Sequence, residues 1–179
     1  MPEFEVDTGT ATWPHELYEL LRAHGITQFA YVPDAGHRVL IDRSLADNEV
    51  HSVALTTEEE GIAMAAGAWL GGQRAALLMQ SSGVGNCINM LSLPVSCRMP
   101  FLTLVTMRGE WGEFNPWQVP MGQITASALR LCGVIVHEVT TAELAAPTVE
   151  AAGRIAFNSN RAVAVLLSQQ MLGTKLFKD

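Results

Sequence analysis

The sequence predicts an open α/β fold, a mostly parallel six-stranded sheet with helices on both faces. Two observations predict it. Short apolar stretches alternate with helical patterns along the chain, and several of the stretches are apolar on both faces. Strands of this kind, separated by helices, are typical of a parallel sheet that is covered on both sides. In such sheets ligands bind where strands end and helices begin.

The first half of the chain shows the alternation. Trp13–His24 carries leucines on one face and is closed by a glycine, as expected of a helix. Phe29–Val32 is a short apolar strand that Pro33 stops, and an Asp-Ala-Gly turn then leads into a helix carrying Leu40 and Leu45.

The same alternation of strands and helices continues from His51 to Leu167. His51–Leu55 is the second strand, and it leads into a helix over Thr56–Trp69. Arg74–Met79 is the next strand, followed by a glycine-containing turn at Ser81–Gly85. The remaining expected elements are helices at Ile88–Val95, Ser127–Leu131 and Glu143–Phe157, and strands at Pro100–Thr106, Val134–Val136 and Ala162–Leu167.

Composition indicates one domain. The chain has 179 residues, of which 49% are hydrophobic, so we expect a single domain over 1–179 with short flexible ends, up to about Thr10 and after Ser168. A net charge of −7 without a basic run argues against nucleic-acid or anionic-membrane binding. The chain has no charged-then-apolar leader, no apolar run of about 18 residues and no metal-site spacing among its three cysteines, so we expect a cytoplasmic protein.

Three consecutive carboxylates open the helix at Thr56–Trp69, whose other residues are mostly small and apolar. One explanation is a capping box, either Thr57 with Glu60 or Thr56 with Glu59, and acids in the first turn also suit the helix dipole. A cap needs one glutamate and the dipole tolerates a second. The third is therefore a candidate for chemistry.

Two strand-to-helix turns carry unusual residues. In the first, Asp34 either caps the next helix or binds a ligand, and His37 is either a surface residue or a group that handles protons. In the second, Gly83 and Gly85 allow the backbone to approach a ligand. This turn matches neither the dinucleotide fingerprint nor the P-loop.

The longest irregular segment is Met107–Gln123, and a connection of this length in an α/β domain is usually functional or disordered. Its aromatic residues argue against disorder. If exposed they indicate a protein interface or a pocket wall; otherwise they fold back onto the domain. They are Trp111, Phe114 and Trp117.

The same segment holds a cation near the expected site. Arg108 either meets an anionic substrate or pairs with Glu110 or Glu113. The residue types alone leave both alternatives open.

Four stretches in order, VPDAGH, TTEEEGIAMAAGAWLGG, LLMQSSGVGNCINML and RGEWGEFNPWQVPMGQIT, resemble the pyrimidine-binding domain of thiamine diphosphate enzymes. The similarity covers roughly Trp13–Leu167 and is greatest to the alpha subunits of sulfopyruvate decarboxylases. Phosphonopyruvate decarboxylases share the pattern. The resemblance implies a subunit that decarboxylates a small anionic 2-oxo acid, 3-sulfopyruvate first, on thiamine diphosphate.

In such enzymes a glutamate at a fixed distance before a helical glycine binds the pyrimidine ring and promotes its imino form. With Gly67 as that glycine the glutamate is Glu58, whereas aligning Trp69 selects Glu59. We take Gly67 as the better anchor, because we expect a neighbouring helix or the cofactor to press on it. Glu58 is thus the expected catalytic acid, with Glu59 in reserve.

The resemblance implies further site residues. Val84 would pack on the pyrimidine, with Gly83 and Gly85 permitting the approach. Asn86 and Asn89 match polar positions of the related decarboxylases, and Gln118 resembles the glutamine of their active-site loop. We expect Asn86 and Gln118 at the substrate, although Asn86 can also cap a helix.

One residue of the turn after the first strand departs from the family pattern. Asp34 is expected at the substrate. His37 stands where the family often has serine or an acid, and we assign it to proton transfer.

The chain lacks the Gly-Asp-Gly motif with which this family binds the diphosphate and Mg²⁺. The resemblance therefore implies that no metal ligand lies in this chain, and that a beta subunit holds Mg²⁺ and the diphosphate. At least two copies of each subunit would form the active hetero-oligomer, with Trp111–Trp117 as a candidate contact.

Other functions fit the same fold. The chain can be a subunit for phosphonopyruvate or another 2-oxo acid, or a non-catalytic partner that holds a catalytic subunit. It can also be a standalone small-molecule binding module, which would be a monomer with its own ligand affinity.

Overall fold

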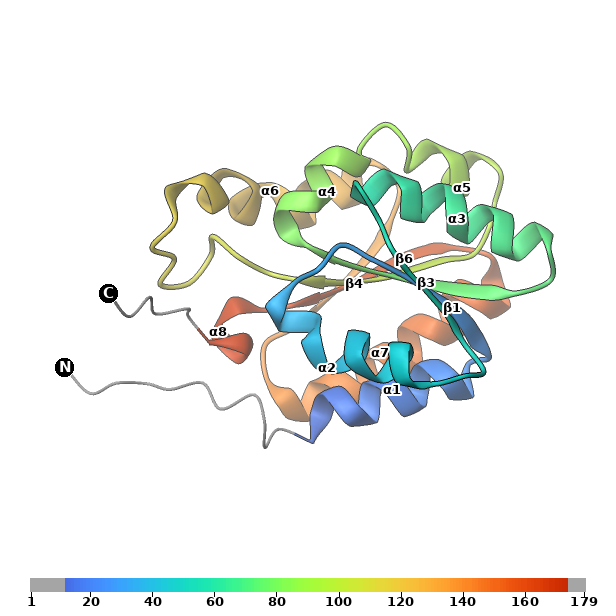
Figure 1. The fold of residues 1–179 in the computed structure, drawn as a ribbon. Helices are drawn as coiled ribbons and strands as arrows, with labels where there is room; N and C mark the ends of the chain where they lie inside the picture. The colour runs from blue at the N-terminus through green and yellow to red at the C-terminus, as the bar shows by residue number, and fades with distance from the viewer. Residues whose placement is uncertain (1–11, 174–179) are drawn as a thin grey trace.

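The computed structural model describes residues 12–173, which form one sheet of six strands in the order β2-β1-β3-β4-β6-β5 (Figure 1). Every neighbouring pair is parallel. The predicted α/β class and the six strands are confirmed. The strands are β1 (Ile26–Tyr31), β2 (His51–Ala54), β3 (Arg74–Gln80), β4 (Phe101–Thr106), β5 (Ile135–Val139) and β6 (Ala162–Leu167).

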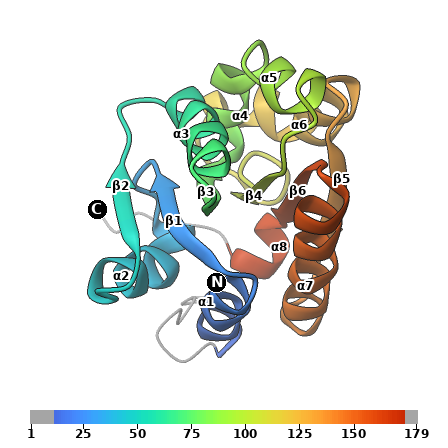
Figure 2. The ribbon, with the colours of Figure 1, turned by 90° about the vertical axis from the view of Figure 1, so that its right-hand side faces the viewer.

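Helices cover both faces, as Figure 2 shows with the sheet turned. One face carries α3 (Glu58–Leu70), α4 (Ser81–Cys87), α5 (Ser92–Ser96) and α6 (Val119–Leu131), and the other carries α1 (Trp13–Ala23), α2 (Arg38–Ala46) and α7 (Ala142–Ser159). Two 3₁₀ turns, η1 (Ala35–His37) and η2 (Pro116–Gln118), precede α2 and α6, and α8 (Gln169–Leu172) follows β6. Each face has its own apolar cluster, so the core is two layers divided by the sheet.

The strands differ in burial according to their place in the sheet. All residues of β4 and β6 are buried, as a strand with helices on both sides requires. The edge strand β2 has no fully buried residue. The continuous apolar runs of the sequence therefore mark the centre of the sheet.

The chain reverses its direction of travel across the sheet after β2, because β1 lies between β2 and β3. This arrangement creates a switch point between β1 and β3, where the connections leaving the two strands diverge. Ligands of open α/β sheets bind at the carboxyl ends of the strands beside such a point. The segments that follow β1, β2 and β3 are those that carry Asp34, Glu58 and Gly83.

Several predicted elements were wrong. The expected turn at Ser81–Gly85 is the helix α4, and the expected helix at Ile88–Val95 is reduced to α5. Two glycines lower helix propensity, but Val84 and Cys87 are fully buried, and their packing holds the segment helical.

The start of α6 and the end of the chain also differ from expectation. Helix α6 begins at Val119 and not at Ser127, because Pro120 lies in its first turn, where proline is tolerated. The stretch after Ser168, expected to be loose, contains α8, whose Gln169 is buried. The other expected loose ends, 1–11 and 174–179, lie outside the described residues.

No helix within residues 12–173 combines the length and the apolarity that crossing a membrane requires.

The glycine that is pressed by its surroundings on α3 is Gly61, whereas Gly67, chosen as the anchor, is exposed. A Cβ at Gly61 would lie 2.4 Å from Leu77 Cδ1, and one at Gly67 would meet no described atom within 4 Å. The expectation that a neighbouring helix presses on Gly67 was therefore wrong. The close packing of α3 on β3 occurs one residue after the three acids.

These two glycines give a matched pair of variants. We expect Gly61→Ala to lower the free energy of unfolding by about 1 to 2 kcal/mol, since the added methyl overpacks the contact with β3. Gly67→Ala should raise it by about 0.5 to 1 kcal/mol, since alanine is the better helix former and has room. Urea unfolding of the two variants and the parent chain measures both. Equal effects of the same sign would contradict the packing described here.

Candidate active site

The three acids at the start of α3 have different surroundings. Glu58 is buried, with 8% of its surface exposed, and its Oε2 accepts a hydrogen bond of 2.8 Å from Nδ2 of Asn86 on α4. Glu59 accepts a bond from the hydroxyl of Thr57, and Glu60 accepts one from the backbone N–H of Thr56. Only Glu58 has its hydrogen-bond partner on another helix.

Neither predicted capping box forms. Thr57 stands at the N-cap position but its hydroxyl donates to Glu59, so the pairs are Thr57 with Glu59 and Thr56 with Glu60. The Thr57 hydroxyl holds the pKa of Glu59 below its usual value. Glu59 and Glu60 thus serve the first turn of the helix, and Glu58 is the acid that this local structure does not require.

Helix α4 lies against the Glu58 carboxyl. A Cβ at Gly83 would lie 2.3 Å from Oε1 of Glu58, so no larger residue fits there without moving the carboxyl. Gly85 is exposed, whereas Val84 is fully buried in the apolar cluster and presents no surface to a ligand in this chain. The structure therefore brings Glu58, Gly83 and Asn86 together, and turns Val84 toward the core.

Asp34 caps η1, which was one of its two predicted roles. Its Oδ2 accepts from the N–H of Gly36 at 2.9 Å and from Oγ1 of Thr106 at 2.8 Å, and its Oδ1 accepts from Nε2 of Gln80 at 2.9 Å. Burial acts to raise the pKa of Asp34, but the nearby His37 and these hydrogen bonds outweigh it and hold the pKa below its usual value. The carboxylate joins the ends of β1, β3 and β4.

His37 does not fit the proton transfer assigned to it. The ring is fully buried, and its Nε2 lies 3.0 Å from the carbonyl oxygen of Leu104 and 3.2 Å from that of Met79. Since only an N–H can bond to carbonyls, Nε2 carries the proton. Burial lowers the pKa of His37 and outweighs the nearby Asp34 and the two carbonyl oxygens, which act to raise it. The histidine links β3 to β4 and has no surface with which to reach a substrate.

The loop after β4 is fixed by an ion pair. Arg108 makes two bonds to the carboxylate of Glu113, 2.7 Å from Nε and 2.6 Å from Nη2, and both side chains are largely buried. The hydrogen bonds from Arg108 lower the pKa of Glu113 to about 2. Of the alternatives for Arg108, pairing with Glu113 is the one observed.

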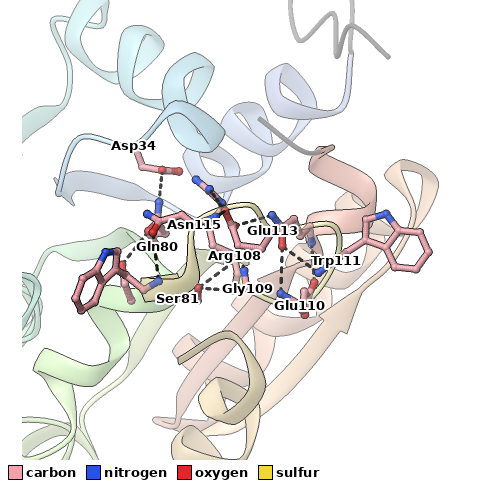
Figure 3. A network of polar contacts seen from close by, with 12 residues as sticks. Asp34, Gln80, Ser81, Arg108, Gly109, Glu110, Trp111, Glu113 and Asn115 are labelled. Atoms are coloured by element: carbon pink, nitrogen blue, oxygen red, sulfur yellow. Dashed lines mark hydrogen bonds and ion pairs between the residues drawn. The ribbon is translucent and has the colours of Figure 1, made fainter. Parts of the chain in front are cut away.

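Figure 3 shows Arg108, Glu110, Trp111 and Glu113 in this network, and Gln169 of α8 completes it. Its side-chain oxygen accepts from the N–H groups of Glu110 and Trp111, both at 3.1 Å, and its amide donates to Glu113 at 2.9 Å. Its backbone N–H donates to the carboxylate of Glu110 at 2.7 Å. Sequence reasoning missed Gln169 because the residue lies where a loose end was expected, and no local pattern marks it.

The rest of the loop is open to solvent. Trp111 and Phe114 are 55% and 53% exposed, and Trp117 is 86% exposed. The aromatic residues therefore do not fold back onto the domain.

Gln118 is the last residue of η2 and is half-buried. Its side-chain oxygen is buried and has no hydrogen-bond partner among the described residues. Within residues 12–173, no hydrogen bond joins Gln118 or Asp34 to Glu58, and no cluster of three or more His, Cys, Asp or Glu side chains could hold a metal ion.

Comparison with known proteins gives close relatives. No family model matches the chain. It is 36% identical to the sulfopyruvate decarboxylase subunit alpha of Methanothermobacter thermautotrophicus, over 84% of this chain and 92% of that protein. It is 33% identical to the same subunit of Methanococcus maripaludis, over 84% and 91%. The phosphonopyruvate decarboxylase of Streptomyces viridochromogenes is 41% identical over 60% of this chain and 28% of that protein.

A solved structure shows the same fold. The 2-oxoglutarate:ferredoxin oxidoreductase of Magnetococcus marinus superposes with a TM-score of 0.67, over 89% of this chain and 29% of that one. The sequence identity is 14%, so the likeness extends to the architecture alone.

The Arg108–Glu113 pair predicts a pH-dependent stability. Glu113→Gln should lower the free energy of unfolding at pH 7 by about 3 kcal/mol, because it leaves a largely buried guanidinium without its counter-charge. A carboxyl with a lowered folded-state pKa stabilises the fold above its unfolded value of 4.5, and this contribution is lost as the pH falls toward about 2. The difference between the two proteins should therefore shrink over that range. Urea unfolding at several pH values measures it.

The control is Glu138→Gln, which breaks an exposed pair with Arg130 of the same 2.6 Å length. This variant should change the stability by no more than about 1 kcal/mol. Similar losses in both variants would show that the buried pair has no special weight.

Proposed function

The chain belongs to the family of sulfopyruvate decarboxylase alpha subunits, and from this premise we propose that it is the pyrimidine-binding subunit of a thiamine diphosphate-dependent 2-oxo acid decarboxylase. The observation that carries the proposal is the position of Glu58. Its carboxyl is buried at the carboxyl edge of the sheet, next to the switch point, and is held by a helix other than its own.

The proposed reaction converts 3-sulfopyruvate to sulfoacetaldehyde and carbon dioxide. The relatives that match along most of their own length are named for sulfopyruvate. A second candidate substrate is phosphonopyruvate, favoured by 41% identity to a phosphonopyruvate decarboxylase over 110 residues. That match covers 28% of the relative, and we therefore place the sulfonate first.

The residues around Glu58 fit the pyrimidine ring of the cofactor. One carboxylate oxygen is bonded to Asn86, and the other lies beside Gly83 in a place where a side chain would intrude. Such a group can share one hydrogen bond with a ring nitrogen while its orientation stays fixed. A glutamine in its place cannot exchange a proton, and an aspartate is one methylene too short.

When bound, the cofactor would act as the electron sink for the carbon that loses carbon dioxide. The part of this chain is to hold and move a proton at Glu58. The carboxyl would bond to the ring nitrogen and favour the imino form of the aminopyrimidine. Ile62 and Ala65 are both buried on the same helix, so the face of α3 that continues from the first turn is apolar.

A partner subunit is part of the proposal. The sequence has no Gly-Asp-Gly motif, so Mg²⁺ and the diphosphate would be held by a beta subunit, with at least two copies of each chain in the assembly. The exposed Trp111 and Trp117 offer a surface for that contact. Gln118 and Asp34 remain the predicted substrate residues. The three cysteines are free thiols, which suits the expected cytoplasm.

Replacing the acids one at a time in the complex with the partner tests the proposal. Glu58→Gln should lower kcat by at least about 10²-fold to 10⁴-fold, the range of acid-base catalysis. Glu59→Gln and Glu60→Gln should keep kcat within about threefold, since their carboxylates serve the helix start. Carbon dioxide release from sulfopyruvate, phosphonopyruvate and pyruvate, assayed in parallel, measures activity and substrate together.

Two outcomes would favour the rival functions. An assembled complex that stays fully active with Glu58→Gln and Glu59→Gln would make the chain a non-catalytic partner. A chain that stays monomeric in the presence of the beta subunit, and binds a small ligand alone, would be a standalone binding module.

A further inference from the structure

We propose that Asn86 is a positioning residue, which holds the carboxylate of Glu58 in the orientation that the cofactor requires. This inference rests on the proposed function and deepens it. The sequence placed Asn86 at the substrate or at a helix cap; the structure does not show it as an N-cap, since Gln80 and Leu91 hold those positions of α4 and α5. Asn86 lies in the last turn of α4, and its amide nitrogen is 2.8 Å from Oε2 of Glu58.

The face of α4 that meets Glu58 consists of two residues with complementary properties. Gly83 and Asn86 are three positions apart and therefore lie on the same side of the helix. Gly83 leaves room, since a Cβ there would lie 2.3 Å from Oε1 of Glu58. Asn86 supplies the donor to Oε2. One oxygen is backed by the helix and the other is bonded, so the carboxyl has little freedom to rotate.

The chemistry of an amide suits this task. The NH₂ group can only donate, so it engages one oxygen of the Glu58 carboxyl, while the other stays available for a ring nitrogen. Glu59 and Glu60 have no such partner, because their carboxylates are bonded to threonines of the same turn. The donor from α4 is thus directed at one acid of three.

The bond is not needed to satisfy a buried amide. Asn86 is exposed, and water would serve its amide group if Glu58 were absent. Replacing Asn86 should therefore leave the fold intact and change the orientation of Glu58 alone.

A double-mutant cycle in the complex with the partner tests this role. Asn86→Ala should lower kcat about 10-fold to 100-fold, as loss of an orienting residue does, with KM changed less than about twofold. In the Glu58→Gln background the same substitution should change kcat less than about twofold, because the group through which it acts is gone. Asn86→Asp keeps the shape but replaces the donor with a second carboxylate, and should lower kcat at least as much as alanine.

A measurement without turnover accompanies the rates. The dissociation constant of thiamine diphosphate, followed by quenching of tryptophan emission, should rise about fivefold to tenfold with Asn86→Ala and should not rise further in the Glu58→Gln background. Asn158→Ala, which replaces an exposed asparagine of α7, serves as the control and should change neither rate nor affinity.

The alternatives give different results. Equal losses from Asn86→Ala in both backgrounds, or a loss confined to KM, would make Asn86 an independent substrate contact and overturn the positioning role. If Asn86→Ala changes neither kcat nor the dissociation constant of thiamine diphosphate, the positioning role is also overturned. If Glu58→Gln itself has no effect, the proposed function fails first, and the positioning role fails with it.

Discussion

The arrangement of the site depends on the close approach of α4 to the first turn of α3 at Gly83. The backbone of α4 lies where any side chain would displace the carboxyl of Glu58. Helix α4 also buries Val84 and Cys87 in the core. Burial, together with the charges of Glu58 and Glu59, raises the pKa of the Cys87 thiol to about 12, so an uncharged sulfur lies near the carboxyl. Glu58 is thus held between a helix backbone and an apolar layer.

The rest of the carboxyl edge is held by side chains that bond to backbone or to one another. Asp34 joins the ends of three strands, and the hydroxyl of Ser81 exchanges two hydrogen bonds with the backbone of Arg108 (Figure 3). Gln169 fixes the following loop from α8. A site on such a frame needs little reordering when a ligand binds, and this favours tight geometry at Glu58.

The sequence predicted the sheet well because its central strands are continuously apolar. This pattern is typical of parallel strands, which helices cover on both faces. It did not predict α4, since two glycines in seven residues read as a turn, and only tertiary packing of Val84 overrides that preference. His37 and Gln169 were misread for a related reason. Both are polar residues whose partners are distant in the chain, at Leu104 and at Glu110, and no local pattern encodes those contacts.

The count along the chain that selected Glu58 used a reference glycine on which no other element of the described chain presses. Gly67 served as the reference glycine, yet it is open to solvent, and the glycine that constrains Glu58 is Gly83 on the next helix. Three adjacent glutamates have the same composition and dipole environment. They differ in their partners. Glu58 meets the amide of Asn86 and the space left by Gly83 on α4, whereas Glu59 and Glu60 are bonded to threonines of their own turn. Tertiary structure therefore distinguishes Glu58 from the other two acids, through its contact with α4, a helix that the sequence did not predict.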